Sequence, residues 1–243
     1  LFSCDAFGSY GALSGSLYDD TCRDLEHFER EALRYYANIV ALYSPKVLKA
    51  IARLEELGLE IGCVAPAHGL VWRRNPGRIV SLYKKWAEGH ATGGERGVAL
   101  LYASMYGNTE KYMNAVAQGL AGAGMPVEIF DVARVHASFV SAAVLKYRGI
   151  LLGVPTYEAG LFPPMAHQLD IIERKKMKHK VAGIFGSYLW SGGAQKEFRT
   201  FAEQLKWNVV EAEEFKGGPY EHELDAAFAF GKKFAADVNA ACT

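Results

Sequence analysis

The 243-residue sequence predicts an α/β protein whose larger part is a doubly wound parallel sheet, preceded by a smaller region of different character. From Val98 onward, short apolar runs typical of buried strands alternate regularly with segments of helical periodicity. Before Val98, helical segments surround a short strand pattern. Regular alternation favours parallel strands joined by right-handed crossovers, with helices on both faces of the sheet.

The smaller region opens on an apolar segment with no initiator Met, cap or polar lead-in, which indicates a piece of a longer chain. Helical spacing of apolar residues, a proline at a helix start and a glycine at a helix end locate its further elements. They are a Gly- and Ser-rich loop over 7–15, helices over 21–43 and 44–58, a buried strand over 59–66 and a helix over 79–87.

Residues 89–95 have the composition of a linker, so we expect two domains, residues 1–95 and residues 96–243. The second domain alternates strand and helix patterns throughout. Its expected strands cover 98–103, 127–131, 149–154, 180–185 and 209–214, and its expected helices cover 110–122, 138–145, 164–173, 193–205 and 221–238. Ligands of such sheets bind beyond the carboxyl ends of the strands, where the strand order reverses.

Charge and cysteine content argue against several classes of protein. Lys and Arg together number 27, as do Asp and Glu, so no basic excess attracts nucleic acid or anionic lipid. No apolar run is long enough to span a bilayer, and no signal-peptide pattern is present. The four cysteines lack CxxC spacing and are too few for a disulfide scaffold, which indicates a reducing compartment. We expect a cytoplasmic protein with no nucleic-acid or membrane partner.

The segment Ser104-Met105-Tyr106-Gly107-Asn108-Thr109 lies between an expected strand and an expected helix, and it has the composition of a phosphate-binding loop. Unpaired N–H groups converge at a helix start, where the helix dipole also favours an anion. The side chains of Ser104, Asn108 and Thr109 add donors. The spacing matches neither the nucleoside-triphosphate loop nor the dinucleotide fingerprint, so a single terminal phosphate is expected. A plain strand-to-helix turn is the alternative.

Two further loops follow expected strands and carry aromatic residues. They are Pro155-Thr156-Tyr157-Glu158-Ala159-Gly160 and Gly186-Ser187-Tyr188-Leu189-Trp190-Ser191-Gly192-Gly193. Aromatic side chains at loop tips are costly to leave in water, and here they lie beside a predicted phosphate site. This combination predicts a flat aromatic ligand held between rings, and flavin mononucleotide (FMN) fits that description. A single aromatic would instead favour ordinary packing.

These three loops resemble the three flavin-binding loops of flavodoxins over roughly residues 96–238. The resemblance implies a flavodoxin-like doubly wound parallel sheet. It also implies that the FMN-binding residues are Ser104, Met105, Tyr106, Gly107, Asn108, Thr109, Pro155, Thr156, Tyr157, Glu158, Ala159, Gly160, Ser187, Tyr188, Leu189, Trp190, Ser191 and Gly192. One departure is Glu158-Ala159, where many relatives carry amides.

The first 95 residues resemble the carboxyl-terminal portion of the metallo-β-lactamase-like αββα domain of flavodiiron proteins. Asp5-Ala6-Phe7-Gly8 is similar to the family's bridging-aspartate segment, and Ala65-Pro66-Ala67-His68-Gly69 to its last iron-ligand segment. The family's amino-terminal part, with the motif that supplies most iron ligands, is not in this sequence. The resemblance therefore carries over only Asp5 and His68, as metal ligands and catalytic residues, and implies a companion fragment or chain that supplies the rest.

As a member of this family, the protein is expected to be an oxidoreductase that passes electrons from an external donor through FMN to a non-haem diiron centre. The centre would reduce dioxygen to water, nitric oxide to nitrous oxide, or both. The family implies a donor such as rubredoxin or a reduced deazaflavin, and a head-to-tail homodimer or a dimer of dimers. The alternative is a flavodoxin-like electron carrier with a vestigial metal domain. The sequence leaves open which gas is preferred and which donor is used.

Overall fold

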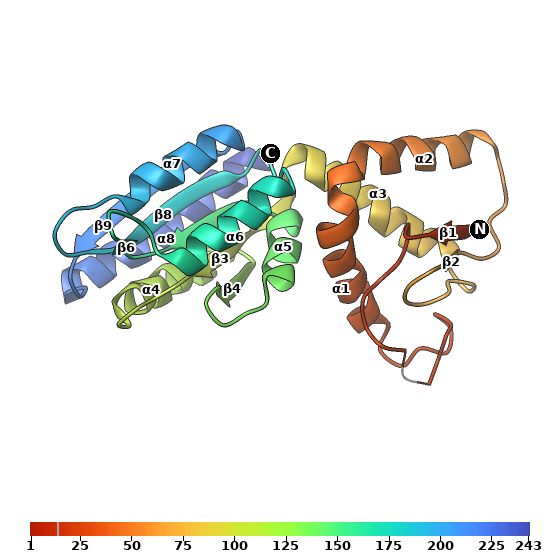
Figure 1. The fold of residues 1–243 in the computed structure, drawn as a ribbon, viewed down its shortest axis with the longest axis horizontal. Coiled ribbons are helices and arrows are strands. Elements are labelled where there is room, and N and C mark those ends of the chain that lie inside the picture. Colours follow the sequence, from red (N-terminus) through yellow and green to blue (C-terminus); the bar gives the residue numbers. More distant parts are fainter. Residues whose placement is uncertain (14) are drawn as a thin grey trace. The chain divides into compact units, whose positions relative to one another are not determined.

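The computed structural model describes residues 1–13 and 15–243, which form two compact units, Leu1–Thr92 and Gly93–Thr243. Figure 1 shows the elements of each unit coloured along the chain. The larger unit is an α/β fold with strands alternating with helices, as the sequence predicts. In the part of the chain that is described, no helix combines the length and the apolar character needed to cross a membrane.

The larger unit is built on a five-stranded sheet in which every neighbouring pair of strands is parallel. The strands are β3 (Glu95–Tyr102), β4 (Val127–Asp131), β5 (Tyr147–Gly153), β8 (Val181–Tyr188) and β9 (Asn208–Lys216). The helices are α4 (Asn108–Gly122), α5 (Ala137–Lys146), α6 (Pro163–Arg174), α7 (Ala194–Gln204) and α8 (Glu221–Ala241). A short antiparallel pair, β6 (Thr156–Tyr157) and β7 (Gly160–Leu161), follows β5.

The strand order is β4-β3-β5-β8-β9, which is the order of flavodoxin and confirms the predicted fold class. The order reverses at β3, because the chain moves from β3 outward to β4 and then returns to place β5 on the other side. The segments after β3 and β5 therefore leave neighbouring strands at the same edge of the sheet. This edge is the place where doubly wound sheets bind their ligands.

The core of the larger unit lies between the sheet and the helices α4 and α8. Val98, Leu100 and Phe185 of the strands are fully buried there against Val116 and Phe234 of the two helices. A β-carbon added at Gly119 of α4 would lie 2.1 Å from the carbonyl oxygen of Phe228, so the two helices approach backbone to backbone. Figure 1 shows α6 and α7 on the opposite face of the sheet from α4 and α8.

The smaller unit is mainly helical and contains a two-stranded parallel sheet. Its strands are β1 (Phe2–Cys4) and β2 (Ala65–Pro66). Its helices are α1 (Leu25–Tyr35), a π-helical turn η1 (Tyr36–Val40), a 3₁₀ turn η2 (Ala41–Tyr43), α2 (Ser44–Glu56) and α3 (Pro76–Thr92).

An aromatic cluster holds the smaller unit together. The ring of Tyr83 on α3 lies 5.0 Å from that of Phe7, 4.9 Å from that of Tyr36 and 5.4 Å from that of Trp86. The hydroxyl of Tyr83 donates a 2.8 Å hydrogen bond to the carbonyl oxygen of Gly8. This cluster therefore fixes the turn that contains Asp5 and Phe7 onto α3.

A buried carboxylate fixes the start of α3. Asp19 accepts hydrogen bonds from the backbone N–H groups of Arg73, Arg74 and Asn75, at 2.9, 3.1 and 3.0 Å. Although burial alone would raise the pKa of Asp19, these bonds lower it overall. The side chain of Arg73 pairs with Asp20 at 3.0 Å, which indicates a structural role for this basic turn.

Three expectations for the smaller unit need correction. The predicted strand over 59–66 is reduced to Ala65–Pro66, because β1 pairs only with those residues and Leu59 is 61% exposed. The predicted linker over 89–95 is helical up to Thr92, and its last residue begins β3. The predicted helix over 21–43 begins only at Leu25 and changes to a π-helical turn at Tyr36. Ser14, within the predicted loop over 7–15, lies outside the described residues.

Candidate functional site

A cavity of about 470 Å³ opens at the carboxyl edge of the large sheet. Its size lies within the roughly 300–1,000 Å³ range of small-molecule and cofactor sites. Segments that follow β3, β5, β8 and β9 surround it. The lining residues are Ser104, Met105, Tyr106, Asn108, Thr109, Pro155, Thr156, Tyr157, Glu158, Ala159, Ser187, Tyr188, Leu189, Trp190, Ser191 and Gly217.

The segment after β3 forms one end of the cavity. The Ser104 hydroxyl accepts a 3.0 Å hydrogen bond from the N–H of Gly107, which closes the loop into a tight turn. Gly107 has a φ of 86°, a value that glycine adopts without strain, and it directly precedes α4. Among the described side chains, none caps the first turn of α4. Asn108 and Thr109 of that turn line the cavity, so its N–H groups, which lack intrahelical partners, can serve as anion donors.

The segment after β5 forms a second wall as a short hairpin. Thr156 pairs with Leu161 and Tyr157 pairs with Gly160, so the turn consists of Glu158 and Ala159. Both turn residues have positive φ, 47° and 61°, as in a type I′ turn. Positive φ is unfavourable for residues other than glycine, so neighbouring structure must hold this turn in place.

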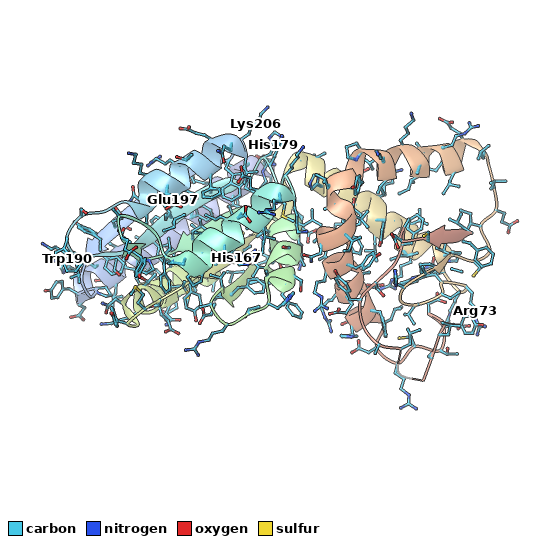
Figure 2. The ribbon with its side chains drawn as sticks, viewed as in Figure 1. Arg73, His167, His179, Trp190, Glu197 and Lys206 are labelled. Atoms are coloured by element: carbon cyan, nitrogen blue, oxygen red, sulfur yellow. The ribbon has the colours of Figure 1, made fainter. Side chains whose placement is uncertain are left out.

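The segment after β8 carries the most exposed aromatic side chain of the cavity. Trp190 is 95% exposed and Tyr106 is 84% exposed, and both line the cavity. Figure 2 shows Trp190 at the far end of its loop, away from the sheet. The hydroxyls of Thr109 and Ser187 lie 3.4 Å apart, which links this segment to the start of α4. The cavity thus combines a donor-rich end with aromatic walls.

The carboxyl group of Glu214 on β9 lies behind the hairpin and the segment after β8. It is hydrogen-bonded to the side chain of Thr156, and its Oε2 lies 3.0 Å from where a β-carbon of Gly192 would be. Burial raises the pKa of Glu214, and the bond to Thr156 opposes that shift. The site therefore has a carboxyl group of elevated pKa directly behind its lining.

The cavity includes most of the residues predicted from the sequence and differs from that prediction in four positions. Gly107, Gly160 and Gly192 do not line it but shape the segments that do. Gly217, which follows β9 and has a φ of 75°, lines the cavity and was missed. The signal that could have found it is its place after a strand of the same parallel sheet.

The residues present fit FMN. The buried hydroxyl of Thr109, the hydroxyl of Ser104 and the N–H groups at the start of α4 suit a phosphate. The aromatic side chains of Tyr106, Tyr157 and Trp190 suit the faces and edges of a flat ring system.

A second constellation lies in the smaller unit. The Nε2 atom of His68 lies 3.4 Å from Oδ1 of Asp5, and both side chains are more than half exposed. The N–H of Ala67 donates a 2.8 Å hydrogen bond to the carbonyl oxygen of Cys4. The N–H of Ser9 donates a 3.2 Å hydrogen bond to the carbonyl oxygen of His68. The two segments predicted to hold metal ligands are therefore paired by their backbones.

The pKa of Tyr35, which lies beside this pair, is strongly raised. The ring of Tyr35 lies 5.8 Å from that of His68, and its hydroxyl is hydrogen-bonded to Asp5. Burial, and then the negative charge of Asp5, raise the pKa of Tyr35 to about 12. Tyr35 therefore stays a neutral donor that can orient the Asp5 carboxylate.

Asp5 and His68 alone do not fit a diiron centre. Within residues 1–13 and 15–243, no group of three or more His, Cys, Asp or Glu side chains is arranged to hold a metal ion. Two ligands are too few for two iron ions, each of which needs several His and carboxylate ligands.

The fold and the cavity are those of a flavodoxin-like protein, and the similarity of the chain to known proteins agrees with this class. The chain belongs to the flavodoxin family, whose model matches residues 100–231. It is also homologous over almost its whole length to flavodiiron proteins, which confirms the resemblance seen in the sequence.

Three relatives illustrate the similarity. The chain is 33% identical over 240 residues to a nitric oxide reductase of Moorella thermoacetica, covering 98% of this chain and 59% of that protein. It superposes with a TM-score of 0.91 and 26% identity on rubredoxin oxygen:oxidoreductase of Desulfovibrio gigas, covering 99% of this chain and 59% of that one. The flavodiiron protein of Giardia intestinalis gives a TM-score of 0.92 and 25% identity, with the same two coverages. The chain thus spans about three fifths of the length of these relatives.

Proposed function

We propose that this chain is the flavin-bearing portion of a flavodiiron oxidoreductase. Such an enzyme takes electrons from an external donor through FMN to a non-haem diiron centre that reduces dioxygen to water, nitric oxide to nitrous oxide, or both. The observation that carries the proposal is that one chain contains both the donor-rich aromatic cavity and the paired Asp5 and His68 segments. The oxidoreductase names of the relatives support the same class.

FMN, when bound, supplies electron transfer in single or paired steps. The chain's own residues would bind and orient it. Thr109 and the start of α4 would hold the phosphate, and the aromatic side chains would cover the ring and keep water from it. Glu158, at the tip of the hairpin, would place a carboxylate beside the flavin.

We further propose that a companion polypeptide supplies the remaining iron ligands, because Asp5 and His68 are only two. The chain spans 59% of the length of the Moorella relative, and the rest of that relative is not matched by these 243 residues. Phe2 on β1 is 95% exposed and Leu59 is 61% exposed, which supports a further packing partner for this unit. We place the complex in the cytoplasm, since four cysteines without CxxC spacing suit a reducing compartment.

The proposed assembly is a head-to-tail homodimer, or a dimer of dimers, in which the flavin of one subunit serves the metal site of the other. Its external donor would be rubredoxin or a reduced deazaflavin. The exposed Trp190 and Tyr106 at the cavity support a second surface that covers them. Two-fold symmetry would create two equivalent flavin-to-metal pairs from one self-complementary interface.

Mixed dimers test the assembly. One variant, Thr109→Glu, should not bind FMN, and a second, with Asp5→Ala and His68→Ala, should not complete the metal site. Each variant, assayed without the other variant but with the companion polypeptide present, is expected to be inactive. After subunit exchange, mixed dimers should recover part of the activity, because they hold one complete pair. If mass spectrometry demonstrates that subunits have exchanged and the mixed dimers still recover no activity, the head-to-tail assembly is contradicted.

The second candidate is an electron carrier that binds FMN and uses no iron. The lack of a three-ligand group of His, Cys, Asp or Glu side chains among the described residues favours it. Flavin and iron contents of one native sample, with intact masses of all its chains, separate the two functions. The proposed enzyme requires flavin, iron and a companion species together, whereas the carrier contains flavin without iron.

A further inference from the structure

The hairpin formed by β6 and β7 is a strained element of the cavity wall. Its two turn residues, Glu158 and Ala159, both have positive φ, and both line the cavity. Neither is a glycine, and neither is the Asn or Asp that such turns prefer. The turn's own sequence therefore does not explain its conformation, and its support must come from outside the hairpin.

One such support, beside the bonds that Thr156 makes to Glu214 and to the N–H of Ala194, is a charged side chain on α7. Oε2 of Glu197 accepts a 2.7 Å hydrogen bond from the N–H of Leu161, in the strand that closes the hairpin. A charged acceptor makes such a bond about twice as strong as a neutral one. Glu197 is half-buried, and Figure 2 shows it on α7 beside the hairpin.

Two glycines allow this close approach. A β-carbon at Gly160 would lie 2.7 Å from Oε2 of Glu197, so a larger residue there would displace the carboxylate. A β-carbon at Gly193, just before α7, would lie 2.0 Å from the carbonyl oxygen of Ala159. The first turn of α7 thus meets both the tip and the closing strand of the hairpin.

We infer that Glu197 is a positioning residue for the flavin: it anchors the β6–β7 hairpin to α7 and so sets the wall of the cavity that meets the ring. This inference rests on the proposed FMN site, but the anchor itself is a property of the chain without flavin. Glu197 does not line the cavity, so its effect must pass through the hairpin.

The test compares Glu197→Ala, Glu197→Gln and Glu203→Ala. Glu203 is an exposed glutamate on the same helix and does not line the cavity, so it controls for charge and helix propensity. Two quantities are measured on the full chain: exchange of the Leu161 amide hydrogen without FMN, and the dissociation constant and midpoint potential of FMN.

Glu197→Ala should lose protection of the Leu161 amide, bind FMN about tenfold more weakly and shift the midpoint potential. Glu197→Gln should keep the protection and bind within about threefold of the parent, because its amide oxygen still accepts the bond. Glu203→Ala should match the parent in every measurement.

Three outcomes would overturn the inference. The first is an unprotected Leu161 amide in the parent, and the second is equal protection in Glu197→Ala and the parent. The third is loss of protection in Glu197→Ala with unchanged FMN affinity and potential, which would make the anchor purely structural. If neither the parent nor Glu203→Ala binds FMN, the proposed function fails, and the exchange data still decide whether the anchor exists.

Discussion

The hydroxyl oxygens of Thr109 and Ser187 lie 3.4 Å apart, which joins the first turn of α4 to the end of β8 inside the cavity. Thr109 is almost completely buried there. A buried hydroxyl at a helix start, next to a second hydroxyl, is an arrangement that suits a phosphate oxygen. This contact ties the donor-rich end of the cavity to the segment that carries Trp190.

Replacing Thr109 with Glu should abolish FMN binding. The substitution puts a carboxylate where the phosphate is expected and removes a donor, so affinity should fall by about 100-fold or more. Quenching of flavin fluorescence during titration measures the change. Thr109→Ser, which keeps the hydroxyl, is the matched control and should bind within about threefold of the parent. Equal affinity of Thr109→Glu and the parent would mean that the phosphate lies elsewhere.

Replacing Trp190 with Ala should weaken FMN binding without affecting folding. An aromatic contact contributes roughly 0.5–1.5 kcal/mol, so the affinity should fall about three- to tenfold. The unfolding midpoint should stay unchanged, because the side chain is 95% exposed. Tyr43→Ala removes a 52% exposed aromatic from the other unit and is expected to leave the affinity unchanged. If both variants bind FMN like the parent, Trp190 does not contact the flavin.

Replacing Glu158 with Gln should raise the midpoint potential of the bound flavin. A carboxylate beside the ring disfavours added negative charge, and at an exposed site this costs on the order of 1 kcal/mol, or tens of millivolts. The potential is measured by equilibration with redox dyes. Because the residue is exposed, the difference should shrink in high salt. Glu221→Gln, outside the cavity lining, controls for net charge. A lower or unchanged potential in Glu158→Gln would contradict this account.

The stability of the larger unit should depend on pH through Lys180. This side chain is buried, and its Nζ donates 2.7 Å hydrogen bonds to the carbonyl oxygens of Gly93 and Tyr147. Burial, and then the charge of Arg148, lower the pKa of Lys180 from 10.5 to about 7. Between those two values the unfolded chain binds a proton that the folded chain has released, so the free energy of unfolding rises with pH.

Urea unfolding of the parent and Lys180→Met at pH 7, 8 and 9 measures this contribution. The parent's free energy of unfolding, relative to that of the variant, should rise by about 1 kcal/mol from pH 7 to 8 and by about 1.3 kcal/mol from pH 8 to 9. The comparison cancels other groups that titrate in this range. A difference that stays constant with pH would show that Lys180 keeps its proton in the folded state.

Much of the larger unit could be predicted because its signals are local. The apolar strand ending at Tyr102 and the polar segment from Ser104 to Thr109 are adjacent in sequence, so periodicity and composition locate them together. Gly217 was missed because it has no side chain to mark it as a ligand-binding residue, and it reaches the cavity only through the order of the strands. Glu197 gives no signal in the sequence, since its partner Leu161 is 36 residues away.

The smaller unit was harder to predict for a different physical reason. An apolar run such as 59–66 forms a strand only where a neighbouring strand pairs with it along its length. Here β1 pairs only with Ala65–Pro66, and Leu59 remains exposed to solvent. The glycines before Glu95 favour a linker by composition, yet α3 continues to Thr92 because Tyr83 and Trp86 anchor it in the aromatic cluster.

The cavity is proposed to hold a flavin whose phosphate lies at the start of α4. The most direct measurement is a fluorescence titration of the chain with FMN and, separately, with riboflavin, which has the same ring and no phosphate. We expect one FMN site per chain and an affinity for FMN at least tenfold higher than for riboflavin, since only the phosphate uses the donors around Thr109. Equal affinity for the two ligands, or no binding of either, would contradict it.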